Sequence, residues 1–303
     1  MEKTMETFQM LDTEQCNPAT RQIDRLSTLE MVQLINQEDH RCAEAVSRVL
    51  PEIAKSVDVI EAQLRQGGRL FYVGAGTSGR LGVIDAAECP PTYGVPSDLV
   101  NGLIAGGPLA LIKSVEGAED SREMGKKDLV DRGFSRKDAL VGIAASGRTP
   151  YVLGAMDYAR EVGAPVMALT CCSESEMSRH ADITMAPLPG PEVITGSSRM
   201  KSGTCQKMIL NMLSTCTMVK LGKVYGNLMV DVQATNEKLI SRAIRIVQAA
   251  TGSEESKARQ TLEQCGYACK TAIVMLLLNL DAEEAEKKLQ AANGFIARAV
   301  ERK

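Results

Sequence analysis

The sequence contains no tryptophan, and aromatic residues make up only 3% of its 303 residues. Proteins that bind single-stranded nucleic acids stack bases on aromatic side chains, so this composition argues against that function. The net charge of −3 and the isoelectric point of about 5.7 argue against binding to a phosphate backbone. The longest apolar run, residues 272–280, is far shorter than the roughly 18 residues of a membrane span. We expect neither a nucleic-acid partner nor membrane association.

The sequence also lacks the pattern of a secreted or metal-binding protein. Residues 1–4 are polar and acidic, which is not typical of a signal peptide. The nine cysteines are an odd number without a Cys-x-x-Cys pair, and there are only two histidines. A structural zinc site needs four convergent cysteine or histidine ligands. We therefore predict reduced, mostly buried cysteines, no metal, and a reducing, cytoplasmic location.

Short apolar runs alternate with helical patterns through the middle of the chain. The runs are residues 69–73, 103–105, 139–143, 165–170 and 181–185, with helical sequence from Gly107 to about Val130 and from about 203 to 221. This alternation is typical of βαβ units, which form a parallel sheet covered by helices on both faces. With 44% hydrophobic residues, the chain can bury such a core. The predicted fold class is therefore α/β, with a doubly wound parallel sheet.

Helical sequence lies on both sides of this region. Ser27 and Glu30 have the spacing of a capping box, and Pro51 is expected to break or kink the helical pattern that follows. No strand pattern is found from residue 234 to the end. We predict an N-terminal segment and helical arm over 1–55, a sheet-containing domain over 56–233, and a small all-helical domain over 234–303.

Three loops rich in glycine, serine and threonine follow predicted strands or precede a predicted helix, at residues 74–80, 145–149 and 196–204. In an open parallel sheet such loops gather at the carboxyl edge, where ligands bind. A tight turn explains one such loop, but three together, with hydroxyls and helix N-termini behind the glycines, favour binding of an anion.

The anion is not expected to be a nucleotide. The first loop, residues 74–80, formally matches the Gly-x-Gly-x-x-Gly pattern of dinucleotide-binding proteins at Gly74, Gly76 and Gly79. However, no acidic residue at a later strand end is placed to hold a ribose. The Gly-x₄-Gly-Lys-Ser/Thr pattern is absent. Hydroxyls at Thr77 and Ser78 favour the terminal phosphate of a small molecule.

Two of these loops, residues 73–82 and 144–151, resemble those of sugar isomerase (SIS) domains, which have a flavodoxin-like fold and bind sugar phosphates. Longer motifs are similar to those of N-acetylmuramic acid 6-phosphate etherases. These motifs are residues 85–94 (DAAECPPTYG), 115–121 (VEGAEDS), 195–204 (TGSSRMKSGT), 227–231 (NLMVD) and 234–237 (ATNE). The resemblance extends from about Ile23 to the C-terminus.

The resemblance implies a lyase of peptidoglycan recycling and amino-sugar catabolism. Such an enzyme cleaves the D-lactyl ether of N-acetylmuramic acid 6-phosphate to N-acetylglucosamine 6-phosphate and D-lactate. It also implies a homodimer that needs no metal or organic cofactor. The acid/base residues that it implies are Glu88 in the first motif and Glu119 in the second, where Glu116 and Asp120 flank the matching position. We expect Glu88 at the end of a short helix that Pro90–Pro91 terminates.

Carboxyl groups suit this chemistry. An alkoxide leaves poorly from a dialkyl ether, but opening the sugar ring gives an aldehyde that acidifies the proton on C2. One carboxylate can remove that proton while a carboxylic acid protonates the departing lactate oxygen, after which water adds to C3. This elimination and addition needs paired carboxyl groups beside a fixed phosphate.

For the ligand we predict contacts from the three loops. The expected phosphate-binding residues are Thr77, Ser78, Ser146, Gly147, Arg148 and Thr149, with Ser198 and Lys201 contacting the ligand from the same or the partner subunit. A non-catalytic sugar-phosphate sensor similar to the glucokinase regulatory protein, and an aldose–ketose isomerase, are the alternatives. The regulatory protein has two such domains in a longer chain, and the motifs around Glu88 and Glu119 favour the etherase.

Overall fold

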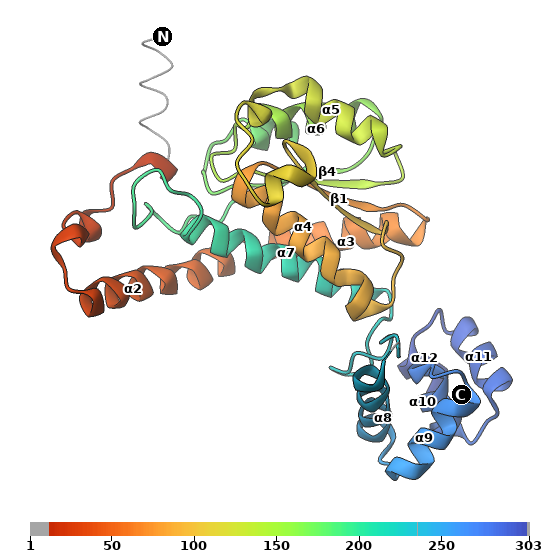
Figure 1. Ribbon diagram of the computed structural model, residues 1–303. Coiled ribbons are helices and arrows are strands. Elements are labelled where there is room, and N and C mark those ends of the chain that lie inside the picture. The colour runs from red at the N-terminus through yellow and green to blue at the C-terminus, as the bar shows by residue number, and fades with distance from the viewer. Residues whose placement is uncertain (1–11, 235, 302–303) are drawn as a thin grey trace. The chain divides into compact units, whose positions relative to one another are not determined.

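Five parallel strands form one sheet in this computed structural model, which describes residues 12–234 and 236–301 (Figure 1). The strands are β1 (Leu70–Gly74), β2 (Val100–Ile104), β3 (Ala139–Ile143), β4 (Val166–Leu169) and β5 (Ile183–Met185), in the order β2-β1-β3-β4-β5. This is the strand order of flavodoxin-like doubly wound folds, and it confirms the predicted fold class. Residues 1–4, on which the signal-peptide prediction depends, and Thr235 of the ATNE motif lie outside the described residues.

Helices cover both faces of the sheet. Figure 1 shows α5 (Arg122–Asp131) and α6 (Pro150–Glu161) on one face, and α3 (Leu50–Arg65), α4 (Gly76–Tyr93) and α7 (Lys201–Lys220) on the other. Every residue of β1, β3 and β4 is buried, as expected for strands covered on both sides. The carboxyl ends of the strands are therefore the part of the sheet that remains available for a ligand.

Two glycines allow α5 and α6 to pack backbone against backbone. A Cβ atom at Gly125 would lie 1.9 Å from the carbonyl oxygen of Tyr151, and one at Gly154 would lie 2.0 Å from that of Arg122. Any side chain at either position would force the helices apart. The separation of α5 and α6 at this contact therefore leaves no room for a methyl group between the two backbones.

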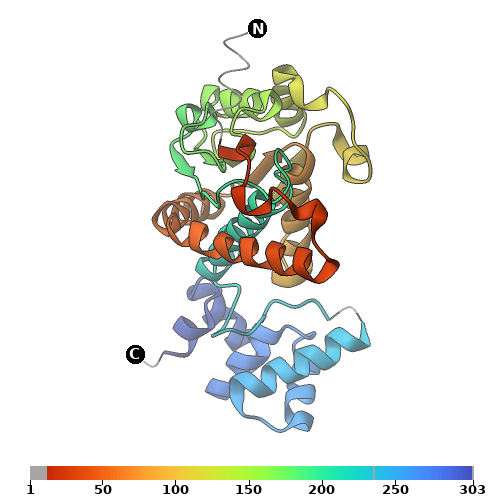
Figure 2. The same cartoon turned by 90° about the vertical axis from the view of Figure 1, so that its left-hand side faces the viewer.

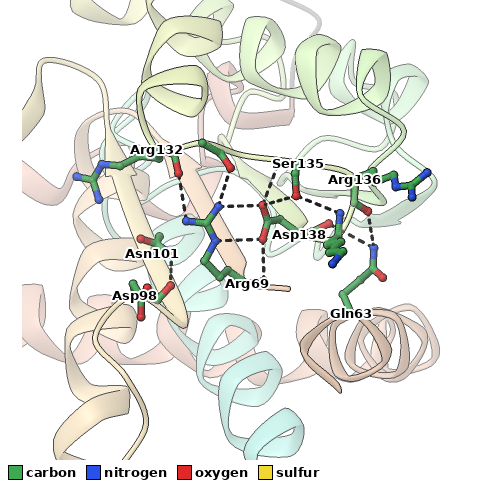
Figure 3. A network of polar contacts seen from close by, with 10 residues as sticks. Gln63, Arg69, Asp98, Asn101, Arg132, Ser135, Arg136 and Asp138 are labelled. Atoms are coloured by element: carbon green, nitrogen blue, oxygen red, sulfur yellow. Dashed lines mark hydrogen bonds and ion pairs between the residues drawn. The ribbon is translucent and has the colours of Figure 1, made fainter. Parts of the chain in front are cut away.

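An ionic cluster joins the amino ends of β1 and β3 (Figure 3). The Asp138 carboxylate, 2% exposed, accepts two hydrogen bonds from the Arg69 guanidinium at 3.1 and 3.0 Å and one from the Arg69 backbone at 2.8 Å. The same guanidinium donates to the carbonyls of Arg132 and Gly133. The cluster ties three segments together at the edge of the sheet opposite its carboxyl ends, and we assign it a structural role.

The N-terminal arm follows its sequence pattern. Helix α2 (Thr28–Ser47) begins at Ser27, whose side chain and that of Glu30 form the predicted capping box. The expected break is also confirmed, because α2 ends at Ser47 and α3 begins at Leu50 with Pro51 in its first turn, where a proline is tolerated.

Two helix predictions are wrong. The helical sequence expected from Gly107 to about Val130 instead forms the 3-10 turns η4 (Gly107–Leu111) and η5 (Ala118–Asp120), and α5 begins only at Arg122. Gly117 has a φ of +72°, a left-handed conformation that interrupts the helix. The helix containing Glu88 was expected to end at Pro90–Pro91, but α4 continues to Tyr93. Both prolines lie in its last turn, so only two intrahelical hydrogen bonds are lost.

The C-terminal region is helical, without a strand among residues 236–301. It contains α8 (Glu237–Thr251), α9 (Glu255–Gln264), α10 (Cys269–Leu278), α11 (Ala282–Ala291) and α12 (Ile296–Val300) around a core of their own that includes Ile244, Ile273 and Val274.

Contacts divide the chain into two compact units at 87/88, 97/98 and 214/215, so residues 88–97 group with the C-terminal unit. The boundaries at 55 and 233 stay predictions. None of the described helices is both long and apolar enough to cross a membrane.

Candidate active site

A pocket of about 260 Å³ opens at the carboxyl edge of the sheet. All three glycine-, serine- and threonine-rich loops contribute to it, together with part of the N-terminal segment. Its lining residues are Thr13, Glu14, Ala75, Gly76, Thr77, Ser78, Glu119, Ala144, Ala145, Ser146, Thr149, Ser197, Ser198 and Arg199. The pocket thus combines seven hydroxyls, two carboxylates and one guanidinium. Four of the hydroxyls come from the first two loops, two from the third loop and one from Thr13.

The first loop places Thr77 and Ser78 in the first turn of α4. Ser78 is buried, and its hydroxyl lies 2.9 Å from the side-chain oxygen of Gln206 on α7. A serine hydroxyl has one proton to donate. If the Gln206 amide is rotated by half a turn, its nitrogen donates to Ser78 and the serine proton is released toward the pocket. As the amide stands in the structure, this nitrogen, Nε2, is buried and has no hydrogen-bond partner among the described residues.

The second loop leads from β3 into α6. Ser146 and Thr149 line the pocket, and Thr149 precedes Pro150, the first residue of α6, without making a capping hydrogen bond through its side chain. Gly147 and Arg148 are not among the lining residues. Gly147 donates its N–H to the carbonyl of Ala144 and accepts from Met177, so its backbone groups are used within the loop. The structure therefore brings Ser146 and Thr149 into the pocket, but not Gly147 or Arg148.

The third loop precedes α7, and its charges are arranged differently from the prediction. Ser198 lines the pocket, as does the exposed Arg199, which the sequence analysis did not select. The N-terminus of α7 is already occupied by a carboxylate, because Glu192 accepts the N–H groups of Lys201 and Ser202, each at 3.0 Å. An anionic ligand therefore has the N-termini of α4 and α6, not that of α7, available to it.

Lys201 lies outside the pocket and is fully buried. Its ammonium contacts Glu38 Oε2 at 2.5 Å and donates to the carbonyl of Pro189 at 3.1 Å. Burial would raise the pKa of Glu38, but the hydrogen bonds from Lys201 and Asn17, with the positive charges of Lys201 and Arg41, outweigh burial and lower its pKa from the ordinary value of 4.5. This pair joins α2 to α7, so the described contacts of Lys201 are structural.

Glu119 lines the pocket from the turn η5. Gly117, in its left-handed conformation, begins this turn, and the Ser121 hydroxyl ends it by capping α5 at the N–H of Met124. Of the flanking acidic residues, neither Glu116 nor Asp120 lines this pocket. Glu116 instead lines an adjacent pocket of about 270 Å³, with Gly76 and Arg80 of the first loop, and Glu119 lines both pockets. Of the three acidic residues, Glu119 is thus the one that reaches all three glycine-rich loops.

Glu88 is not among the residues that line the pocket. It lies twelve residues after Gly76 on the same helix, which is about 18 Å at a rise of 1.5 Å per residue. Its side chain is exposed, as are those of Ile84, Ala87 and Pro91 at helical spacing on one face of α4. Asp85 of the same motif is buried and accepts hydrogen bonds from Asn211 and Ser214, which join α4 to α7.

Besides Arg199, the sequence analysis missed the N-terminal segment of the pocket. Figure 2 shows its 3-10 turns, coloured red, beside the loop that leads into α7. Asn17 donates to the carbonyl of Pro191 at 3.2 Å, and the Thr20 hydroxyl donates to that of Val193 at 2.8 Å. These contacts carry Thr13 and Glu14 to the pocket. The only local signal was a run of small polar residues, which is equally typical of an irregular terminus.

The cysteine thiols and the other side chains that could bind a metal ion are dispersed. No group of three or more histidine, cysteine, aspartate or glutamate residues within 12–234 and 236–301 is arranged to hold a metal ion. All nine cysteines lie in these ranges, six of them buried, and none is in a disulfide. Burial raises the pKa of the Cys171 thiol to about 12 and so keeps it protonated.

Comparison with known families agrees with this geometry. The profile of the N-terminal SIS domain of the glucokinase regulatory protein matches residues 52–160, and the general SIS domain profile matches residues 118–216. The profile of the C-terminal lid domain of the glucokinase regulatory protein matches residues 226–271.

Individual proteins match this chain over nearly its whole length. The N-acetylmuramic acid 6-phosphate etherase of Aliivibrio fischeri (strain MJ11) is 59% identical over 290 residues, covering 96% of this chain and 97% of that protein. The etherase of Serratia proteamaculans (strain 568) is 56% identical over 292 residues, covering 96% and 98%. A solved phosphoheptose isomerase from Neisseria gonorrhoeae has a TM-score of 0.51 at 18% identity, covering 63% of this chain and 99% of that one. This last likeness concerns the fold alone.

The buried pair beneath the pocket leads to a stability prediction. Replacing Lys201 by Met leaves the Glu38 carboxylate buried without its ammonium partner, and we expect the free energy of unfolding to fall by about 3–5 kcal/mol at neutral pH. Denaturant titration measures this loss. The double variant Lys201→Met/Glu38→Leu should recover most of it, because no buried charge then remains.

The same pair gives a pH dependence. Because its folded-state pKa is held below 4.5, ionised Glu38 stabilises the wild type at neutral pH, and this stabilisation is lost as pH falls through the lowered pKa. The difference between wild type and Lys201→Met should therefore shrink below about pH 4.5. A difference that is small at neutral pH or unchanged in acid contradicts this account of the pair.

Proposed function

The chain belongs to the N-acetylmuramic acid 6-phosphate etherase family, and from this premise we propose how its pocket performs the reaction. The protein is a carbon–oxygen lyase that cleaves N-acetylmuramic acid 6-phosphate to N-acetylglucosamine 6-phosphate and D-lactate. The observation that carries the proposal is one pocket that combines the hydroxyls of two phosphate-type loops with Glu119.

The 6-phosphate binds at the N-termini of α4 and α6. Thr77, Ser78, Ser146 and Thr149 supply hydroxyl donors, and the positive ends of the two helices favour the phosphate charge. Ser198 completes the donor set from the third loop. Gly147 shapes the turn before α6, Arg148 lies beside it, and Lys201 holds α7 in place from below.

With the phosphate fixed, the sugar extends toward Glu119. Opening of the ring acidifies the C2 proton, a carboxylate removes it, and a carboxylic acid gives a proton to the lactate oxygen as the C3–oxygen bond breaks. Water then adds to C3 of the unsaturated aldehyde. Glu119 is one of the two carboxyl groups, and each well-placed proton transfer contributes roughly 10²–10⁴ in rate.

Glu88 supplies the second carboxyl group, and it does so in the pocket of a partner subunit. Only a few bonds separate the phosphorus of the substrate from C2 and C3, whereas about 18 Å of α4 separates Gly76 from Glu88 in one chain. A homodimer that brings Glu88 of the partner toward the pocket removes this difficulty.

Exposed apolar side chains support the homodimer. Ile84 on the same face as Glu88 is 58% exposed, and Leu29 and Val32 on α2 are 64% and 53% exposed. Leu29 and Val32 lie one turn apart on α2, and neighbouring exposed apolar side chains of this kind are typical of surfaces covered by another protein. We place the dimer in the cytoplasm, where a reducing environment suits nine cysteines without a disulfide.

The regulatory-protein and isomerase alternatives explain less of the sequence similarity than the etherase does. The family profiles of the glucokinase regulatory protein match parts of the chain, but the etherases match nearly all of it at 56–59% identity. Release of D-lactate from N-acetylmuramic acid 6-phosphate distinguishes the etherase from both alternatives.

The phosphate anchor is tested at Ser146. We expect Ser146→Ala to raise KM about ten-fold or more with a smaller effect on kcat, because a lost hydrogen bond to a charged group costs about 1.5–3 kcal/mol. Unphosphorylated N-acetylmuramic acid should be a very poor substrate. Steady-state kinetics with D-lactate detection measures both, and equal turnover of the unphosphorylated sugar contradicts the anchor.

Isotope labelling tests the bond that breaks. In heavy-oxygen water, elimination and addition should place the label in the C3 hydroxyl of the sugar and leave lactate unlabelled. In deuterated water, deuterium should enter C2 when the abstracted proton exchanges before it returns. Mass spectrometry of the two products reads both results, and heavy oxygen in lactate would show that the other side of the ether is cleaved.

Mixing of two inactive variants tests the origin of Glu88. Glu88→Gln and Glu119→Gln should each be nearly inactive. If Glu88 acts in the pocket of the partner, each mixed dimer has one intact site, so random mixing should restore about one quarter of wild-type activity. Recovery is measured after the subunits have been dissociated and reassociated. No recovery in verified mixed dimers means that Glu88 acts within its own chain.

A further inference from the structure

Glu14 is a second carboxylate in the pocket that contains Glu119, and the reaction described above does not use it. It is the last residue of the turn η1 (Asp12–Glu14) and is half-buried. Its Oε2 lies 3.4 Å from the position that a Cβ atom would occupy at Gly196, which begins the third loop. Glu14 therefore lies where the N-terminal segment meets the loop that contains Ser198.

The position of Glu14 is fixed by buried neighbours. Thr13 before it is 4% exposed, and Asn17 three residues after it is 3% exposed. The Asn17 amide donates to Glu38 Oε2 at 2.8 Å, the same oxygen that binds the Lys201 ammonium. The backbone of Glu14 is thus held between two buried residues, which reduces the conformational freedom lost when the carboxylate meets a ligand.

The charge of Glu14 is unfavourable for the phosphate alone. A carboxylate accepts hydrogen bonds and donates none, and in a pocket of about 260 Å³ it repels a phosphate bound at α4 and α6. The same carboxylate is favourable for a ligand that carries hydrogen-bond donors beyond its phosphate. The sugar offers such donors in its hydroxyls and its acetamido N–H.

We infer that Glu14 is a substrate-binding residue, whose carboxylate accepts a hydrogen bond from a hydroxyl or acetamido donor of the amino sugar while the loops hold the phosphate. The inference rests on the proposed position of the phosphate at the N-termini of α4 and α6. It gives the N-terminal segment a direct part in selecting a sugar phosphate over free phosphate.

The test compares two ligands by calorimetry. For Glu14→Ala we expect the Kd of N-acetylglucosamine 6-phosphate to rise about ten-fold or more, since hydrogen bonds to a charged group are the strong ones. The Kd of inorganic phosphate should stay unchanged or fall, because a repelling charge has been removed. Glu14→Gln keeps an acceptor without the charge and should lie between Glu14→Ala and wild type.

Asp24→Ala is the matched control, since it removes one exposed carboxylate from the same segment. Equal sugar-phosphate affinities in Glu14→Ala, Asp24→Ala and wild type would overturn the inference. A parallel loss of phosphate and sugar-phosphate binding in Glu14→Ala would also overturn it, because the variant would then disturb the loops. Ser146→Ala separates the premise from the inference: undiminished phosphate binding there contradicts the phosphate site, whatever Glu14 does.

Discussion

The ion pair between Lys201 and Glu38 is the interaction on which the arrangement of the pocket depends. Neither charge is accessible to water, and their mutual contact at 2.5 Å is accompanied by hydrogen bonds to Pro189 and Asn17. The pair therefore joins four segments: α2, the N-terminal turns, the loop before α7, and α7 itself. Buried charges are expensive to separate, so the two helices and the two irregular segments are held in one arrangement.

The polar groups of the pocket differ in the kind of ligand atom that they can bind. Hydroxyls and two helix N-termini are available for an anion, while the N-terminus of α7 is neutralised by Glu192. The carboxylates of Glu14 and Glu119 lie on the same pocket from segments that are far apart in the sequence. A phosphate and a set of proton-transfer groups can thus be bound side by side without competing for the same donors.

Local patterns predicted the elements but not the contacts between distant segments. The capping box at Ser27, the five strands and the glycine-rich loops are encoded within short windows, and each was predicted from the sequence. The apolar run 103–105 found only the end of β2, which begins at Val100. Lys201 and Glu38 are 163 residues apart, so their pairing left no local signal, and Lys201 was interpreted as a ligand contact. The continuation of α4 through Pro90 and Pro91 was also missed, because prolines in the last turn of a helix cost only their own hydrogen bonds and need not end it.

The close packing of α5 and α6 at Gly125 and Gly154 has a consequence for how this enzyme tolerates sequence change. Helix α5 begins two residues after the turn η5, which contains Glu119, and that turn also contacts α6. A methyl group at Gly154 would lie 2.0 Å from the carbonyl oxygen of Arg122, so one of the two helices would have to shift, and a shift of α5 would be passed on to the turn η5. Under the role proposed for Glu119, sequence change at Gly154 is therefore constrained by turnover as well as by folding.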